Sequence, residues 1–268
     1  MNSFTVRAFM GTDASLEITL KNSVYNGEYR GKRPMMMVFP GGGYSFCSDT
    51  EAEPIALAYM NEGFSTCILR YSVRHDISEP GLGDLPLSEA IGAVKYVRAH
   101  AEEWNIDENK ISVIGFSAGG HLAASLGVHW NDTARIPSAG EAARPNGIIL
   151  SYPVITGGRL THRGSIEKLT GVDGYSDEDG KYDVSAFVNE DTPPMFIWHT
   201  YEDNAVPVEN SLMMAMAMRK ANRPCALHIF TKGQHGLSLG TDEIRGGPRG
   251  ISKWVEMSVD WLKNMELL

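Results

Sequence analysis

The sequence predicts an α/β protein with an open, mostly parallel sheet that is covered by helices on both faces. Seven short, largely apolar runs recur along the 268 residues, and patterns typical of helices lie between several of them. Strands that are apolar throughout are typical of parallel sheets buried on both faces. Strands that alternate with helices favour the same arrangement, because the crossover helices cover the sheet.

The elements follow in order along the chain. Strands are expected at residues 15–20, 34–39, 65–71, 111–116, 147–152, 194–199 and 225–230. Apolar residues at helical spacing predict one helix through Leu87, Ile91, Val94 and Val97, and another through Trp254, Met257, Trp261 and Met265. Further helices are expected after residue 117 and near residue 207.

Residues 155–193 are polar, glycine-containing and weakly periodic. We expect this segment to be a lid-like excursion over the edge of the sheet, where it could cover a site. No repeat, low-complexity tract or convincing linker divides the chain, so we expect a single domain over residues 1–268.

Composition and charge exclude several classes of function. The formal net charge of −9 argues against a nucleic-acid or anionic-membrane partner, since both would require a basic face. Cys47, Cys67 and Cys225 are odd in number and form no C-x-x-C pair, which favours a reduced compartment. The start of the sequence has neither a basic nor a long apolar region, and no run approaches a membrane span, so a cytoplasmic protein is expected. The sequence leaves open whether it forms a homo-oligomer.

The residues Gly115-Phe116-Ser117-Ala118-Gly119 form a G-x-S-x-G pattern directly after an expected strand and before an expected helix. In that context the pattern indicates a nucleophilic serine on a sharp turn. Such a turn needs small residues two positions before and after the serine, and the helix N-terminus behind it favours developing negative charge. Alternatively, these residues form a glycine-rich turn with an incidental serine.

A carboxylate and a histidine follow in the order that this chemistry requires. Asp203 lies just beyond the strand expected at 194–199, and His235 lies in a loop beyond the strand at 225–230. The carboxyl ends of parallel strands share one edge, where ligands bind, so we expect both residues to lie near Ser117. Glu202 is the alternative acid, although the position four before Pro207 favours Asp203.

Three consecutive glycines, Gly41 to Gly43, follow the strand at 34–39. They could form a flexible joint, a phosphate cradle or a loop whose backbone N–H groups approach a reacting atom. No G-K-[ST] follows, and Phe46 stands where a dinucleotide motif needs its third glycine, so phosphate binding is discounted. Tyr44 and Phe46 could stack on a sugar or simply pack.

The other histidines have weaker support. His199 ends a strand near the expected site and could line it, whereas His121 lies on the expected nucleophile helix. No motif supports His75, His100, His129, His162 or His228. No H-E-x-x-H or paired Cys/His spacing indicates a metal, and we expect no cofactor.

Four blocks of the sequence together resemble the esterase branch of the α/β-hydrolase family, particularly bacterial acetyl-xylan and feruloyl esterase-like members similar to hormone-sensitive lipase. The blocks cover residues 40–73, 99–127, 191–212 and 228–239. The resemblance implies an α/β-hydrolase fold and a triad of Ser117, Asp203 and His235. It also implies an oxyanion hole made by the N–H groups of Gly42, Gly43 and Ala118. Pro40 stands where many relatives have the histidine of H-G-G-G.

The chemistry and the resemblance together predict a serine esterase that hydrolyses short acyl esters, acetyl above all, on xylan-derived or other sugars. The expected partner is therefore a small-molecule or oligosaccharide ester, and Tyr44 is the expected substrate contact. An amidase or peptidase-like serine hydrolase is the alternative within the same chemistry. A ligand-binding protein on a hydrolase scaffold is the alternative without turnover.

Overall fold

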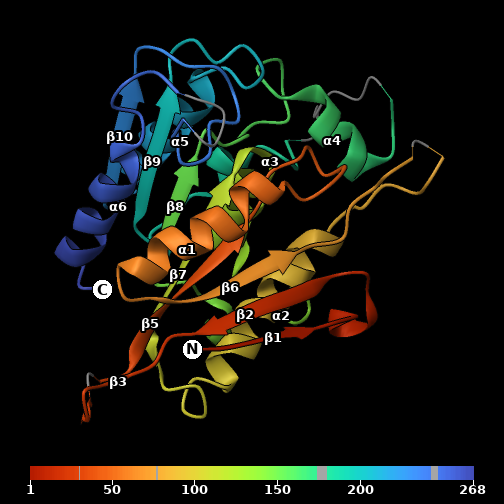
Figure 1. Ribbon diagram of the computed structural model, residues 1–268. Coiled ribbons are helices and arrows are strands. Elements are labelled where there is room, and N and C mark those ends of the chain that lie inside the picture. Colours follow the sequence, from red (N-terminus) through yellow and green to blue (C-terminus); the bar gives the residue numbers. More distant parts are fainter. Residues whose placement is uncertain (30, 77, 174–179, 243–246) are drawn as a thin grey trace.

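The computed structural model describes residues 1–29, 31–76, 78–173, 180–242 and 247–268. A twisted sheet runs through the described residues in the strand order β1-β2-β6-β5-β7-β8-β9-β10 (Figure 1). Its strands are β1 (Asn2–Val6), β2 (Ser15–Leu20), β5 (Arg33–Phe39), β6 (Ser65–Arg70), β7 (Ile106–Phe116), β8 (Gly147–Ser151), β9 (Met195–Thr200) and β10 (Cys225–Phe230). A separate two-stranded ribbon pairs β3 (Val24–Tyr25) with β4 (Glu28–Tyr29).

The sheet is mostly parallel, as predicted. Strand β2 pairs antiparallel with both β1 and β6, whereas every pairing from β6 to β10 is parallel. The seven expected strands all form, and the largest difference is that β7 begins five residues earlier than expected. Strand β1 was not predicted, because it lies at the sheet edge, is mostly exposed and lacks a continuous apolar run.

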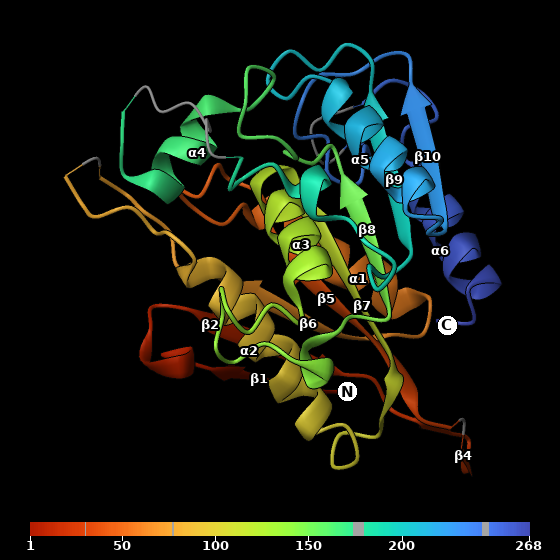
Figure 2. The same ribbon diagram turned by 180° about the vertical axis from the view of Figure 1, so that it is seen from behind.

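Helices cover both faces of the sheet, which confirms the expected fold class. Helices α1 and α6 lie on one face, and α2, α3 and α5 lie on the other (Figures 1 and 2). The helices are α1 (Glu53–Asn61), α2 (Leu85–Ala99), α3 (Ser117–His129), α4 (Arg163–Thr170), α5 (Glu209–Lys220) and α6 (Lys253–Asn264). Short 3-10 turns are η1 (Phe9–Gly11), η2 (Asp49–Glu51), η3 (Glu141–Ala143) and η4 (Val184–Phe187).

Strand β5 shows how the sequence builds two cores. Met35, Met37 and Phe39 belong to one buried apolar cluster, while Met36 and Val38 belong to the cluster on the opposite face. Successive side chains of a strand point to opposite faces, so a strand covered on both sides must be apolar throughout. The two apolar clusters hold the centre of the sheet in place, and polar loops follow the carboxyl ends of its parallel strands.

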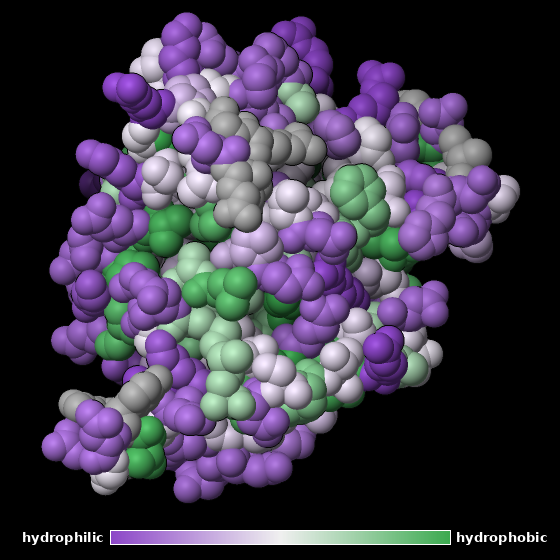
Figure 3. Space-filling model, in the orientation of Figure 1, coloured by the Kyte–Doolittle hydropathy of each residue, from purple (hydrophilic) through white to green (hydrophobic). Residues whose placement is uncertain are grey.

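The segment at 155–193 connects β8 to β9 and contains α4 and η4, and its residues 174–179 lie outside the described part of the chain. In Figure 2, α4 stands apart from the layers of helices, near the end of the sheet where β8 and β9 terminate. On the face shown in Figure 3, hydrophilic residues cover most of the surface and hydrophobic ones form small groups between them. None of the helices in the described ranges is long and apolar enough to cross a membrane.

Candidate active site

Ser117 stands on a strained turn between β7 and α3. Its φ is +53°, in the left-handed region that residues with a side chain seldom adopt. A Cβ on Gly115 would lie 2.2 Å from the carbonyl oxygen of Gly119, and a Cβ on Gly119 would lie 2.2 Å from that of Phe39. Both positions therefore require glycine. The G-x-S-x-G spacing is explained by this close packing, which lifts the serine above the sheet edge.

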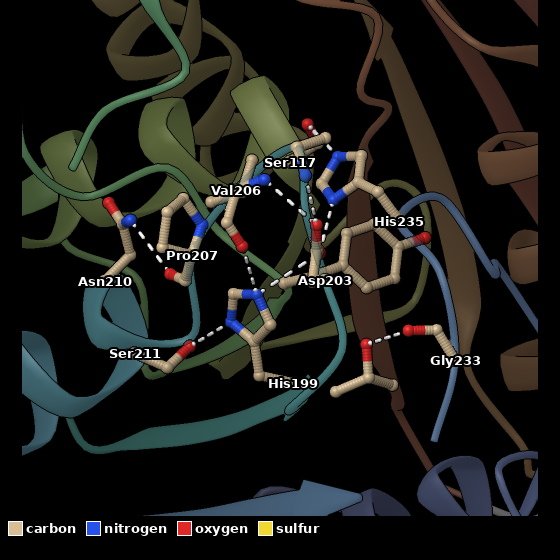
Figure 4. A network of polar contacts seen from close by, with 12 residues as sticks. Ser117, His199, Asp203, Val206, Pro207, Asn210, Ser211, Gly233 and His235 are labelled. Carbon is tan, nitrogen blue, oxygen red and sulfur yellow. Dashed lines mark hydrogen bonds and ion pairs between the residues drawn. The ribbon is translucent and has the colours of Figure 1, made fainter. Parts of the chain in front are cut away.

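Three side chains meet at that edge in a hydrogen-bonded line, with Asp203 between two imidazole rings (Figure 4). His235 Nε2 lies 2.8 Å from Ser117 Oγ, and His235 Nδ1 lies 2.6 Å from Asp203 Oδ2. A carboxylate only accepts, so Nδ1 donates its proton to Asp203 and Nε2 accepts the hydroxyl proton of Ser117. Ser117 and Asp203 are both buried, whereas the His235 side chain is partly exposed.

Asp203 is held as an anion by its surroundings. Burial alone would raise the pKa of Asp203, but hydrogen bonds from His199, His235 and the Val206 N–H more than offset it and hold the pKa well below its usual value. Its Oδ1 accepts the N–H groups of Ala205 and Val206 at 3.0 and 2.9 Å. The carboxylate is therefore fixed in position and remains charged at neutral pH.

His199 is a second histidine on the same carboxylate, and its side chain is fully buried. Its Nε2 lies 3.0 Å from the Val206 carbonyl and 3.3 Å from Asp203 Oδ2, so this nitrogen carries a proton. Its Nδ1 lies 2.7 Å from Ser211 Oγ at the start of α5. Sequence reasoning placed His199 near the site, and the structure places it behind Asp203 rather than in the cavity.

The two neighbouring acids, Glu202 and Asp203, have different partners in the structure. Glu202 pairs with Lys232 on the surface, and this hydrogen bond lowers the pKa of Glu202. Its other carboxylate oxygen lies 3.4 Å from the Gly233 N–H. Asp203 alone of the two contacts His235, so the geometry favours the preferred assignment.

The glycine run forms a tight loop beside Ser117. Gly42 has φ +123°, and a Cβ there would lie 2.0 Å from the Phe46 carbonyl oxygen, while Gly43 has φ +64°. Within the described ranges, neither N–H donates to a protein acceptor. Ala118 is the second residue of α3, where a backbone N–H has no partner inside the helix. All three expected oxyanion donors thus lie around the serine turn, and Gly42 and Gly43 line the cavity described next.

A cavity of about 400 Å³ opens over Ser117 and His235. The glycine loop and its continuation through Glu51 form one wall, and helix α4 with His162 forms another. The polar side chains around it are those of Ser45, Ser48, Thr50, Glu51, Ser117, His162, Glu167, Lys168 and His235, and Phe46 adds an aromatic ring. The side chain of Phe46 is 57% exposed, so its ring is open to a ligand.

The structure corrects the expectation that Tyr44 contacts substrate. Tyr44 is only 1% exposed and does not line the cavity. Its ring packs against Tyr71, and its hydroxyl lies 2.9 Å from His121 Nδ1. His121 Nε2 donates to the Tyr182 carbonyl, so Nδ1 accepts the Tyr44 proton. Tyr44 therefore anchors the glycine loop to α3 and to the segment that follows α4.

Among the cavity-wall residues that sequence reasoning missed are His162 and Glu51. His162 precedes α4, and its Nδ1 lies 2.9 Å from Ser165 Oγ. No motif surrounds His162, and only the expectation that 155–193 covers a site could have brought it here. Glu51 follows the glycine loop by eight residues, and its acidic character gave no sign that it would be buried. Nowhere in the described ranges do three His, Cys, Asp or Glu side chains group to hold a metal.

An α/β sheet with a serine, histidine and carboxylate aligned at its carboxyl edge has the architecture of a serine hydrolase. Comparisons with known proteins agree. Residues 24–155 match the model of the family described as BD-FAE. The chain is 41% identical over 221 residues, 82% of its length, to endo-1,4-beta-xylanase B of Butyrivibrio fibrisolvens. It is 34% identical over 208 residues, 75% of its length, to an acetylxylan esterase of Xylanibacter ruminicola.

These matches span 35% and 40% of the two curated relatives, respectively. A solved structure, the acetyl ester-xyloside bifunctional hydrolase from Caldicellulosiruptor lactoaceticus, superposes with a TM-score of 0.82 at 35% identity. That match covers 96% of this chain and 89% of the other. The chain belongs to the α/β-hydrolase family, in its branch of carboxylesterases similar to hormone-sensitive lipase, which confirms the predicted resemblance.

Proposed function

We propose that this protein is a serine esterase that hydrolyses acetyl and other short acyl esters of sugars, including xylan-derived ones. One observation carries the proposal: the hydrogen-bonded line of Ser117, His235 and Asp203 opens into a cavity beside glycine N–H groups. Acyl transfer needs this combination of nucleophile, base and oxyanion donors. The relatives named for acetylxylan esterase and acetyl ester hydrolase activity support the same chemistry.

In the first half of the reaction, Ser117 Oγ attacks the ester carbonyl as its proton passes to His235 Nε2. Asp203 keeps Nδ1 protonated and stabilises the imidazolium. The N–H groups of Gly42, Gly43 and Ala118 stabilise the tetrahedral oxyanion, and a donor of this kind contributes on the order of 3 kcal/mol. His235 then protonates the alcohol oxygen, the ester C–O bond breaks, and an acyl-Ser117 remains.

In the second half, water replaces the alcohol. His235 takes a proton from the water as its oxygen attacks the acyl carbon, and the same N–H groups hold the second oxyanion. The bond to Ser117 Oγ then breaks, Oγ recovers its proton from His235, and the carboxylic acid leaves. The chain's own residues perform every proton transfer in this cycle.

Polar and aromatic side chains of the cavity wall support a hydroxylated alcohol as the leaving group. Ser45, Ser48 and Thr50 line the same cavity as Ser117, and Phe46 presents an exposed ring. His162 Nδ1 is engaged by Ser165, while its Nε2 meets no protein partner in the described ranges. Burial and nearby His235 lower the pKa of His162, so the neutral ring can donate or accept a hydrogen bond. Such groups can form hydrogen bonds with the hydroxyls of a sugar.

Helix α4 supplies Gly164, Glu167 and Lys168 to the cavity wall, and His162 stands directly before the helix. We therefore propose that 155–193 acts as a lid-like part of a single domain, with its described residues bounding the alcohol side of the site. The geometry of the site fits an ester and an amide equally well. The relatives named for ester hydrolysis favour the ester, and a comparison of substrates tests the amidase alternative.

The deciding experiment is a substrate panel. Acetylated xylo-oligosaccharides, nitrophenyl esters of increasing acyl length and aminoacyl amides are assayed with wild type and with Ser117→Ala as the blank. The proposal expects the highest kcat/KM on acetyl esters, with Ser117-dependent release of acetate from the oligosaccharides. Faster turnover of long acyl chains would contradict the short-acyl part, and faster turnover of amides would contradict the esterase assignment.

A further inference from the structure

A buried carboxylate outside the proposed triad connects the two loops that frame the nucleophile. Glu51 is 4% exposed, yet it forms part of the cavity wall beside Ser117. It ends the turn η2, which follows the glycine loop. A carboxylate in such a position is costly to desolvate unless hydrogen bonds stabilise it, so its contacts indicate why it is there.

On one side, Glu51 holds the glycine loop. Its Oε2 accepts the N–H of Gly41 at 2.9 Å. A Cβ on Gly41 would lie 2.6 Å from this same oxygen and 3.1 Å from Ser117 Cβ. The absence of a side chain at Gly41 thus lets the carboxylate approach the backbone directly before Gly42 and Gly43, whose N–H groups are the proposed oxyanion donors.

On the other side, Glu51 holds the loop of His235 through Tyr152. The Tyr152 hydroxyl donates to Glu51 Oε1 at 2.7 Å and accepts the N–H of Ser238 at 2.8 Å. The Tyr152 ring also packs edge-on against the His235 ring, with 5.0 Å between centroids. Burial, and then the charge of Glu51, raise the pKa of Tyr152 well above its usual value, so the phenol remains a donor.

Two further features fix this connection. Tyr152 has φ +38°, a strained conformation for a residue with a large side chain, directly after β8. Ser238 Oγ donates to the carbonyl of Thr50, the residue before Glu51, and the Ser238 carbonyl accepts the indole N–H of Trp254 at 3.0 Å. The glycine loop, β8 and the His235 loop therefore converge on one buried hydrogen-bonded unit.

We propose that Glu51, acting through Gly41 and Tyr152, is a positioning residue that sets the oxyanion N–H groups relative to His235 and Ser117. It does not touch the reacting atoms. Its effect is to keep two loops from different parts of the chain in the relative positions that the tetrahedral intermediate requires. This inference deepens the proposed function and rests on it.

The test compares Glu51→Gln and Tyr152→Phe with two matched buried controls. Glu89 is also a fully buried carboxylate that accepts hydrogen bonds from the N–H and the hydroxyl of Ser72, and Tyr59 is a buried tyrosine whose hydroxyl contacts Ser258. Neither control residue lines the cavity. Glu89→Gln and Tyr59→Phe therefore report the cost of losing similar buried interactions away from the site.

We expect Glu51→Gln and Tyr152→Phe each to lower kcat on nitrophenyl acetate by roughly 10- to 100-fold with little change in KM, less than the loss of an oxyanion donor itself. Affinity for a boronic acid, which forms a tetrahedral adduct on serine, should fall by a similar factor. Because the two residues act through one hydrogen bond, the double variant should lose less than the product of the single losses. The control variants should stay near wild type in kcat per folded protein.

A merely structural role would lower the unfolding temperature of all four variants and leave kcat and boronic-acid affinity of the folded protein unchanged, which would overturn the inference. Multiplicative losses in the double variant would also overturn it. Failure of the proposed function looks different: wild type would then hydrolyse no acetyl ester. The rate at which a fluorophosphonate labels Ser117 would still compare the variants, and equal rates in all of them would refute the positioning role.

Discussion

The Nε2 atom of His235 lies 2.8 Å from the Oγ atom of Ser117, although 117 residues separate them along the chain. Strand β7 ends directly before the serine and β10 ends shortly before the histidine, and parallel strands bring both ends to one edge. The strained turn at Ser117 aims its hydroxyl at that edge. The site is therefore a consequence of strand direction and of one unusual backbone conformation.

Asp203 and Glu202 provide a test within two adjacent residues. We expect Asp203→Asn to lower kcat by about 10⁴-fold, since an amide at this position favours the wrong tautomer of His235. Glu202→Gln should retain most of the activity, because an exposed ion pair is worth only about 0–1 kcal/mol. Steady-state kinetics on nitrophenyl acetate measures both. A large loss in Glu202→Gln together with an active Asp203→Asn would reverse the assignment.

Substitution of Gly42 tests whether the glycine loop takes part in catalysis. Gly42→Ala places a Cβ where the Phe46 carbonyl stands, so the loop must shift, and we expect kcat to fall by roughly 10²-fold or more. Gly140 also has a positive φ, +148°, but a Cβ there would meet nothing within 4 Å. Gly140→Ala therefore controls for backbone strain alone, which costs about 1–3 kcal/mol. Equal activity of the two folded variants would contradict a role for this loop in catalysis.

Phe46 tests the alcohol side of the cavity. We expect Phe46→Ala to raise KM for acetylated xylo-oligosaccharides by about 2- to 10-fold, since an aromatic contact contributes about 0.5–1.5 kcal/mol. The KM for nitrophenyl acetate, which carries no sugar, should change less. Phe187 is a partly exposed aromatic outside the cavity, so Phe187→Ala is the matched control. If both variants bind the oligosaccharide like wild type, Phe46 is not a sugar contact.

The buried imidazole of His121 should make the stability of the fold depend on pH. Burial lowers the pKa of His121 to about 4, below the value near 6.5 of an unfolded histidine. Between these values the unfolded chain binds more protons than the folded one, so stability is present above about pH 6.5 and is lost as pH falls towards 4. Urea unfolding at several pH values should show a smaller loss for His121→Gln than for wild type.

Tyr44→Phe is the informative companion, since it removes the donor to Nδ1 but keeps the buried imidazole. It should destabilise the protein by about 1 kcal/mol and retain the wild-type pH slope. Equal slopes in wild type and His121→Gln would show that this histidine is not linked to acid unfolding.

The sequence predicted most of the sheet because buried parallel strands carry continuous apolar runs, such as residues 34–39 of β5 and 195–198 of β9. It predicted Ser117, Asp203 and His235 because each follows such a strand in the required order. Strand β1 and helix α1 were not predicted, since an exposed edge strand and a nine-residue helix carry weaker patterns.

Side-chain direction was the main limit at the site. Tyr44 and Phe46 are two residues apart and chemically alike, yet one is 1% exposed and the other 57% exposed. A turn within the glycine loop makes that difference, with the N–H groups of Ser45 and Phe46 both donating to the Gly42 carbonyl. Glu51 and His162 reach the cavity only through tertiary packing, which no local pattern records.

The central claim is that Ser117 carries the acyl group, and the most direct measurement is kcat on an acetyl ester for Ser117→Ala. Ser125→Ala is the control, because Ser125 is a buried serine of the same helix that does not line the cavity. We predict a loss of about 10⁶-fold in Ser117→Ala and near wild-type turnover in Ser125→Ala. A folded Ser117→Ala that retains kcat within tenfold of wild type would contradict the account.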